Sequence, residues 1–187
     1  PARKLKIKRP VENKVPVVLS GREVKSLLSA PKRQMESLIH QREHSTGARN
    51  RYFCAVRDDL ILELLFSTGI RIGELVALNT TDVDLTGKSV QITVRATRGR
   101  LVSLSSEGLV EAVAQYLELR NERTLDTPAL FVGRSGTRLT IYSIENIFKK
   151  HVRLAEIKRH ITPHSLRHTM AAMVVSRATD IREVQEM

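Results

Sequence analysis

One segment, residues 160–176, constrains the fold of this chain more than any other. It reads HITPHSLRHTMAAMVVS. Thr162 followed by Pro163 is typical of a helix start, with Thr162 as the N-cap and proline in the first turn, where its missing N–H costs nothing. Apolar residues recur behind it at helical spacing and predict one buried face; they are Leu166, Met170, Met173 and Val174. We therefore expect an amphipathic helix that begins at this Thr-Pro pair.

The first turns of this predicted helix carry His164 and Arg167 on one face, because residues three apart are neighbours on a helix surface. A helix N-terminus also presents a positive dipole and free N–H groups, which favour an anion and most often a phosphate. The combination predicts a phosphate site that supports phosphoryl-transfer chemistry.

A zinc site is the alternative for the same segment, since His160, His164 and His168 are spaced four residues apart. An HExxH-type site needs a glutamate directly after its first histidine, and Ser165 stands in that place. Pro163 also puts His160 outside the helix. The pattern therefore favours the phosphate site over a metal.

A second motif, STGIRIGEL at 67–75, follows a strongly apolar predicted helix over 50–67. Gly69 ends that helix as a left-handed cap residue would, and Arg71 follows directly at the turn. Residues 72–78 then predict a short second helix. A helix-Gly-helix pattern is also found in DNA-reading helix-turn-helix proteins, but here the second helix is short and mostly apolar, with little to present to base edges.

Taken in this order, Thr-Gly-x-Arg-x-x-Glu-Leu and His-x-Leu-Arg-His-Thr resemble the catalytic domain of tyrosine recombinases, the phage-integrase, Xer and Cre-like enzymes. The resemblance covers the chain from about Lys14 to Met187. It implies a mainly α fold with a small antiparallel β-meander, of the α+β class. It also implies a catalytic domain over 17–187 that lacks its C-terminal end, preceded by a basic interdomain linker over 1–16.

The resemblance assigns roles to five residues of the two motifs. Arg71 and Arg167 would bind the scissile phosphate, since a guanidinium bonds two oxygens and stays charged. His164 would be the acid/base residue of that site. Glu74 would support it, and His168 would be mainly structural.

The family usually places a lysine at the meander turn, where it protonates the leaving 5′-hydroxyl. By position this place falls on Arg95, which stays protonated and is a poor general acid. Arg95 then either only stabilises charge, or the register differs and Lys88 takes the place. Lys88 belongs to the previous turn, which argues against the second option.

The meander itself is predicted from the alternation of apolar residues over 89–94, the return over 101–104 and the preceding segment 82–85. Its basic turn is expected to lie along DNA phosphates. A further predicted helix over 142–155 has a basic side opposite its apolar one. The candidate DNA-binding residues are Lys14, Arg98, Arg100, Lys149 and Lys150.

The charge balance agrees with a polyanionic partner, because 31 Lys and Arg against 20 Asp and Glu give a net charge of +11. With no Trp, four Phe and three Tyr, the chain is poor in the aromatic rings on which single-stranded bases stack. Double-stranded DNA, held through its phosphates, is the expected partner.

The nucleophile is the main departure from the family, which continues past the last residues of this chain to a Leu-Gly-His segment and then a tyrosine. Tyr52, Tyr116 and Tyr142 all precede the His-x-x-Arg helix, so none is at the family's position. We expect a chain truncated before its nucleophile and inactive alone.

The resulting hypothesis is site-specific DNA recombination or integration, as in mobile elements, through a phosphotyrosyl intermediate and without a cofactor or metal. By the same resemblance, the full-length parent would act as a homo-oligomer, a tetramer on paired sites. No membrane span is expected, and a lone Cys54 suits a reducing, cytoplasmic location. The rival hypotheses are a non-catalytic DNA-binding regulator of helix-turn-helix type and a basic RNA-binding helical protein.

Overall fold

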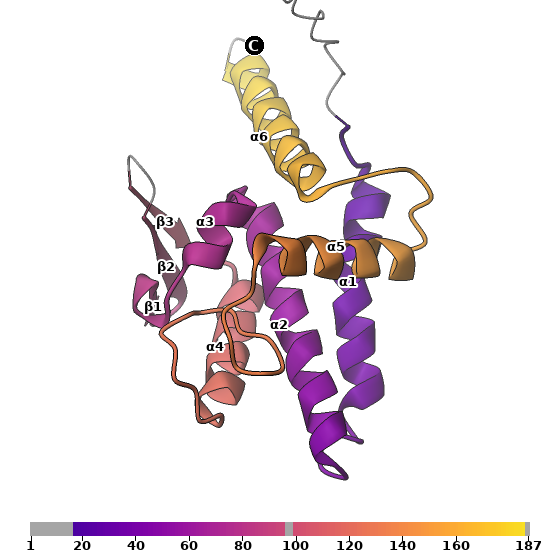
Figure 1. Ribbon diagram of the computed structural model, residues 1–187. Helices are drawn as coiled ribbons and strands as arrows, with labels where there is room; N and C mark the ends of the chain where they lie inside the picture. Colours follow the sequence, from indigo (N-terminus) through magenta and orange to yellow (C-terminus); the bar gives the residue numbers. More distant parts are fainter. Residues whose placement is uncertain (1–16, 96–98, 186–187) are drawn as a thin grey trace, which may run out of the picture.

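The computed structural model describes residues 17–95 and 99–185, with the backbone alone for 177–185. Figure 1 shows a group of helices with a small sheet at one side. In chain order the elements are α1 (Gly21–Leu38), α2 (Thr46–Thr68), α3 (Ile72–Ala77), a 3-10 turn (Thr80–Asp82), β1 (Val83–Thr86), β2 (Ser89–Val94), β3 (Arg100–Leu104), α4 (Glu107–Asn121), α5 (Ile141–Leu154) and α6 (Pro163–Gln185). The predicted mainly α fold with a small antiparallel sheet is confirmed.

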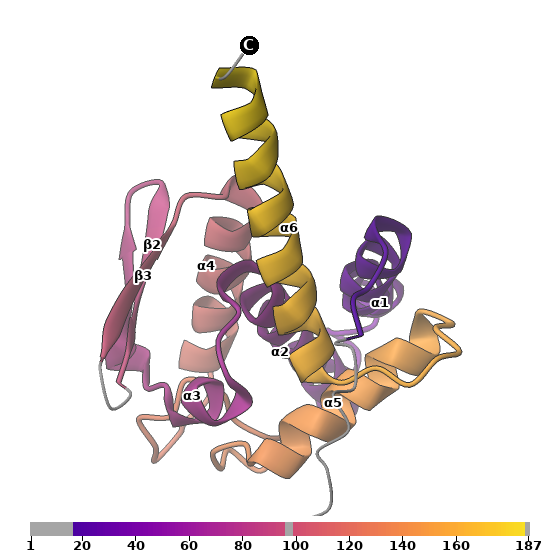
Figure 2. The same ribbon diagram turned by 90° about the horizontal axis from the view of Figure 1, so that it is seen from above.

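The sheet is an antiparallel meander with strand order β1-β2-β3. Its central strand buries Val90, Ile92 and Val94, which alternate along the chain as a half-buried strand requires. Figure 2 shows α4 between the sheet and α2. Val94 pairs with Arg100 as the last pair before the β2–β3 turn. Arg95 and Arg100 therefore stand at the two ends of that turn.

Helix α2 is the centre of the core and is contacted by α1, α4 and α6. From Tyr52 to Leu62 every residue is buried, because apolar side chains occur on all sides of the helix. Cys54 is among them. The ring of Tyr116, on α4, lies 5.7 Å from that of Phe53 and 5.5 Å from that of Phe131, measured between centroids.

One predicted boundary is wrong for a local reason. The helix predicted over 50–67 begins earlier, at Thr46, because the Ser45 side chain caps α2 by accepting from the N–H of Ala48 at 3.1 Å. Helix α6, predicted to begin at the Thr162–Pro163 pair, continues unbroken to Gln185. The sequence after 176 holds no Gly or Pro that would end the helix.

Helix α6 is attached to the rest of the molecule by its first turns only. Ser165, Leu166 and Thr169 are buried, whereas 171, 172 and 174–176 are exposed. Figures 1 and 2 both show its C-terminal half extending clear of the other helices. The part of α6 that carries His164 and Arg167 is therefore the part that the fold holds in place.

Candidate phosphate-binding site

The turn between α2 and α3 is built around Gly69. Its backbone is left-handed, with φ 56° and ψ 28°, as predicted for the cap of α2. The Thr68 hydroxyl donates to the carbonyl of Leu64 at 2.7 Å and accepts from the N–H of Ile70 at 3.0 Å, which fixes the turn from within. Ile70 and Ile72 are buried, so Arg71 between them points outward at the start of α3.

Glu74 holds Arg71 by both its backbone and its side chain. One carboxylate oxygen accepts from the Arg71 N–H at 2.9 Å, and the other accepts from its guanidinium at 3.2 Å. The Arg100 guanidinium donates to both oxygens, at 3.1 and 2.9 Å. Burial opposes the charge of Glu74, but the hydrogen bonds from Arg100 and Arg71 outweigh it and lower its pKa to about 2. Glu74 is therefore an ionised support that joins α3 to β3.

The start of α6 meets this turn. Ser165 organises the first turn, where its hydroxyl accepts from the N–H of Thr162 at 3.1 Å and its own N–H donates to the Thr162 carbonyl at 2.8 Å. The Arg167 guanidinium donates to the carbonyl of Gly69. Because Gly69 is two residues from Arg71, the structure brings the two motifs of the sequence together. His168 is exposed.

Position 69 requires glycine for a second reason besides its left-handed backbone, which is that α6 packs closely against it. A methyl group there would lie against the tip of Met170 and near the side chain of Arg167. The Met170 tip is flexible, so the left-handed backbone is the stronger demand. Both demands act on the turn that Arg167 contacts and that Arg71 follows.

His164 faces a cavity of about 540 Å³ between α5, α3 and the start of α6. Its floor is apolar and includes Ile72, Phe148 and Ile161, and Glu145 is the one acidic residue of its lining in the described structure. The other lining side chains that carry or can carry positive charge are Lys149, Arg153, Lys158, Arg159 and His160. This basic lining suits an anion, and it includes His164 but neither Arg71 nor Arg167.

Other predicted site residues lie elsewhere or have partners of their own. Arg95 is 70% exposed and donates to the buried carboxylate of Asp82 at 2.6 Å. The ammonium of Lys150 donates to Asp58 at 3.0 Å, so it is partly used within the fold, while Lys149 lines the cavity. Lys14 and Arg98 lie outside the described residues, as does the predicted linker over 1–16.

Sequence reasoning missed two groups of polar residues. Thr169 is fully buried, and its hydroxyl accepts from the N–H of Leu19 at 2.9 Å. Asp58 is also buried and binds Arg57, Lys150 and His151. The signal for Asp58 was present, because charged residues inside the otherwise apolar run of α2 require partners when they are buried.

The described structure shows no feature that supports the zinc site or the helix-turn-helix proposed as alternatives from the sequence. The described residues contain no group of three or more His, Cys, Asp or Glu arranged to hold a metal ion. Helix α3, which would be the reading helix of a helix-turn-helix, buries Ile72 and Leu75 and packs against α5. In the described part of the chain no helix is long and apolar enough to cross a membrane.

Comparison with solved structures places the fold among the catalytic domains of tyrosine recombinases. The crystal structure of XerA recombinase superposes with a TM-score of 0.71 at 31% identity, covering 96% of this chain and 58% of that one. A XerH site-specific recombinase bound to a palindromic difH substrate gives 0.72 at 22% identity over 96% of this chain and 48% of that one, which supports the fold alone.

Comparison of sequences leads to the same group. Residues 18–187 match the model of the phage integrase family. Tyrosine recombinase XerC of Corynebacterium glutamicum is 36% identical over 132 residues, 71% of this chain and 42% of that protein. XerC of Pelobacter propionicus is 32% identical over 175 residues, 89% of this chain and 56% of that protein. The chain therefore belongs to the phage integrase family, and it spans about half the length of the curated relatives it matches.

Proposed function

We propose that this chain is the phosphate-binding part of a site-specific tyrosine recombinase, which breaks and rejoins double-stranded DNA through a phosphotyrosyl intermediate. The observation that carries the proposal is the hydrogen bond from Arg167 to the carbonyl of Gly69, two residues before Arg71, which joins the two motifs from distant parts of the chain. Family membership supports the reaction class.

Arg71 and Arg167 would bind the non-bridging oxygens of the scissile phosphate and stabilise the charge that grows there. His164, exposed beside the basic cavity, would move a proton at the reacting oxygen. Glu74 would keep Arg71 in place. Arg95 would stabilise charge rather than donate a proton, because a guanidinium stays protonated.

The nucleophile would be a tyrosine other than the three in this chain. Tyr52 and Tyr116 are buried, and burial raises the pKa of Tyr116 to about 12 while its hydroxyl donates to the Leu130 carbonyl at 2.8 Å. Tyr142 is exposed in the first turn of α5, before the helix that carries His164 and Arg167. The reaction would therefore need a tyrosine supplied by the longer protein.

The partners and location follow from this reaction. Duplex DNA would be bound through the basic cavity rim and the β2–β3 turn, and the whole protein would assemble as a homo-oligomer, a tetramer on paired sites. A cytoplasmic location would give access to DNA. The described residues support charge stabilisation by arginine, and we propose no cofactor.

The proposal is tested by covalent capture, using protein from the whole reading frame and a nicked, labelled duplex selected for binding. A denaturing gel should show a protein–DNA adduct, and Arg71→Ala or Arg167→Ala should reduce it at least a hundredfold, roughly the loss expected for an oxyanion donor. Arg51→Ala is the control, since Arg51 is an exposed arginine on α2 roughly 25 Å along the helix from its C-terminal end. An adduct formed equally well by all variants would refute the arginine roles, and one formed by the 187-residue chain alone would refute the role given to an external tyrosine.

Salt dependence is a simpler expectation for the chain by itself. Its binding to duplex DNA, followed by fluorescence anisotropy, should weaken steeply between about 50 and 200 mM salt, because phosphate contacts release counterions. A matched single strand should bind less tightly. Binding that is independent of salt would rule out the polyanion as the partner.

A further inference from the structure

The first turns of α6 are held from two opposite sides. Arg167 donates to the carbonyl of Gly69, and Thr169 accepts from the N–H of Leu19. Residues two apart on a helix point about 200° away from each other, so these contacts lie on opposite sides of α6. A rotation of α6 about its axis that moved Arg167 would therefore also break the contact with Leu19.

The contact at Thr169 is buried and fully used. Its side chain is completely buried, its hydroxyl donates to the Ser165 carbonyl at 2.7 Å, and the same oxygen accepts from Leu19 at 2.9 Å. Leu19 is itself buried. Loss of the hydroxyl would leave the Leu19 N–H without this partner in a place that water does not reach, which is costly.

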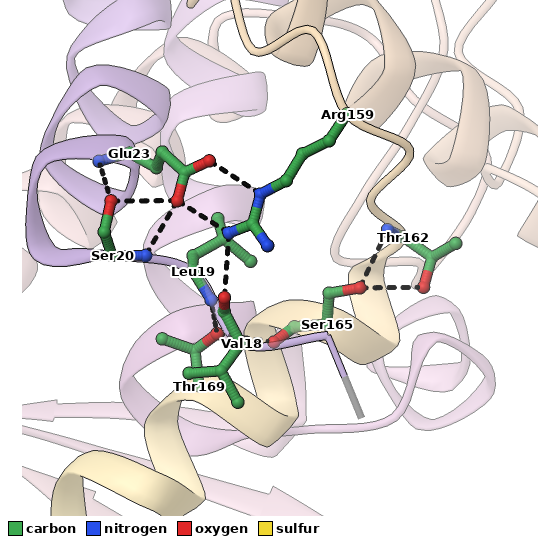
Figure 3. Close-up of polar contacts among 8 residues, drawn as sticks. All are labelled: Val18, Leu19, Ser20, Glu23, Arg159, Thr162, Ser165 and Thr169. Carbon is green, nitrogen blue, oxygen red and sulfur yellow. Dashed lines mark hydrogen bonds and ion pairs between the residues drawn. The ribbon is translucent and has the colours of Figure 1, made fainter. Parts of the chain in front are cut away.

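A second contact fixes the same stretch from the loop before α6. Figure 3 shows Arg159 reaching from this loop to Val18 and Glu23. Its guanidinium donates to the Val18 carbonyl at 2.8 Å and to both carboxylate oxygens of Glu23, at 2.7 and 2.6 Å. One of those oxygens also accepts from the N–H of Ser20 at 2.8 Å. The hydrogen bonds from Arg159 and Ser20 lower the pKa of Glu23 to about 2, so this carboxylate is ionised at neutral pH.

Two successive residues thus have a backbone group bound to α6 or to the loop before it: the carbonyl of Val18 and the N–H of Leu19. The N–H of Ser20 is held by Glu23 of α1, which Arg159 also binds. These bonds join positions as much as 150 residues apart in sequence. In the sequence, these residues closely follow the basic segment 1–16.

We propose that Thr169 and Arg159 are positioning residues that couple the backbone of residues 18–20 to the orientation of Arg167. The inference rests on the proposed function only for its consequence, which is that a shift of the backbone at residues 18–20 would tune the phosphate site. The coupling itself is a property of the folded chain without DNA.

The test uses the 187-residue chain and three substitutions. Thr169→Val keeps the shape and removes the hydroxyl, whereas Thr169→Ser keeps the hydroxyl and loses a methyl group. Ile92→Val is the control for a general loss of stability, because Ile92 is buried in β2, which both views place away from α6. The first readout is the NMR signal of the Arg167 Nε–H in protein free of anions. The second is the affinity for inorganic sulfate.

Coupling predicts that Thr169→Val moves the Arg167 signal and weakens sulfate binding roughly fivefold to tenfold, a usual size for coupling between sites. In Thr169→Ser and in Ile92→Val, the Arg167 signal and the affinity for sulfate should both stay close to those of the wild type. By reciprocity, saturating sulfate should slow hydrogen exchange of the Leu19 N–H in the wild type and have no such effect in Thr169→Val. Arg159→Gln should shift the Arg167 signal in the same direction by a smaller amount.

An unmoved Arg167 signal in Thr169→Val, or an equal shift in Ile92→Val, would overturn the coupling. Failure of the wild type to bind sulfate is a different result, because it would count against the proposed phosphate site. The Arg167 signal in anion-free protein would still decide the coupling in that case.

Discussion

Asp58 and Glu74 are both carboxylates that bind several cationic side chains, yet they leave those cations in different states. Asp58 is 1% exposed, and two of its three partners, Arg57 and His151, are buried with it, while Lys150 is 39% exposed. Glu74 is also mostly covered, but Arg71 beside it remains 61% exposed. An ion pair alone does not separate a structural role from a functional one. The exposure of the cation does, because only an exposed guanidinium has donors left for a ligand.

The largest effect is expected from breaking the buried cluster. Asp58→Asn leaves Arg57 buried with one charge partner removed, and should lower the free energy of unfolding by about 3 to 5 kcal/mol in a urea titration. Burial opposes the charge of Asp58, but the hydrogen bond from His151 and the charges of Arg57 and Lys150 outweigh it and lower its pKa. Asp84→Asn, at an exposed position of β1, is the control. A small loss in Asp58→Asn would mean that the cluster is not structural.

The next residue, Asp59, differs from both Asp58 and Glu74. It is a buried carboxylate, and one of its oxygens has no hydrogen-bond partner. Burial raises its pKa from 3.8 to about 7. Between about pH 4 and pH 7, Asp59 keeps its proton in the folded chain but has lost it in the unfolded chain. The contribution of Asp59 to the free energy of unfolding therefore falls as the pH rises through this range, and it is constant above about pH 7. The free energy of unfolding of Asp59→Asn, measured relative to the wild type, should therefore increase by about 2 to 4 kcal/mol between about pH 4 and pH 7.

Thermal and urea unfolding from pH 4 to 8 measure that gain. Glu74→Gln should change the pH dependence of stability in the opposite direction. The pKa of Glu74 is lowered in the folded chain, so its carboxylate contributes stability that is lost only as the pH falls from about 4.5 toward 2. Parallel profiles for the wild type and Asp59→Asn would show that Asp59 ionises normally.

The smallest effect on stability is expected at Glu74 itself, although of these three carboxylates it is the one whose loss should reduce the chemistry. Glu74→Gln should cost about 1 kcal/mol or less in unfolding at pH 7, because its partners are partly exposed. The covalent adduct should nevertheless fall about tenfold, since a guanidinium that is slightly misplaced loses transition-state stabilisation. A large loss of stability with an unchanged adduct would reverse the assignment of Glu74 and Asp58.

The features that could be predicted from the sequence are those with local causes. The start of α6 at Pro163, the left-handed Gly69 and the alternation in β2 each follow from neighbouring residues. By contrast, hydrophobic periodicity did not predict that the two arginine motifs lie close together; only the family resemblance did. The contact that shows it, Arg167 to Gly69, joins residues 98 apart.

The remainder could not be predicted because its causes are distant in sequence. Thr169 is an ordinary helix residue in the pattern, and only the fold reveals Leu19 against it. Arg159 and Glu23, 136 residues apart, carry no signal that would pair them. Hydrophobic periodicity specifies which face of an element is buried, but it does not name the partner of a buried polar group.

The burial of Cys54 within α2 has a practical consequence for labelling. A thiol inside the core reacts slowly with maleimides and similar reagents, and the chain has no other cysteine. A cysteine introduced at Val174, exposed on the extended part of α6, would therefore take a dye selectively without removal of the native thiol. Such a probe would report the tilt of α6 in single molecules.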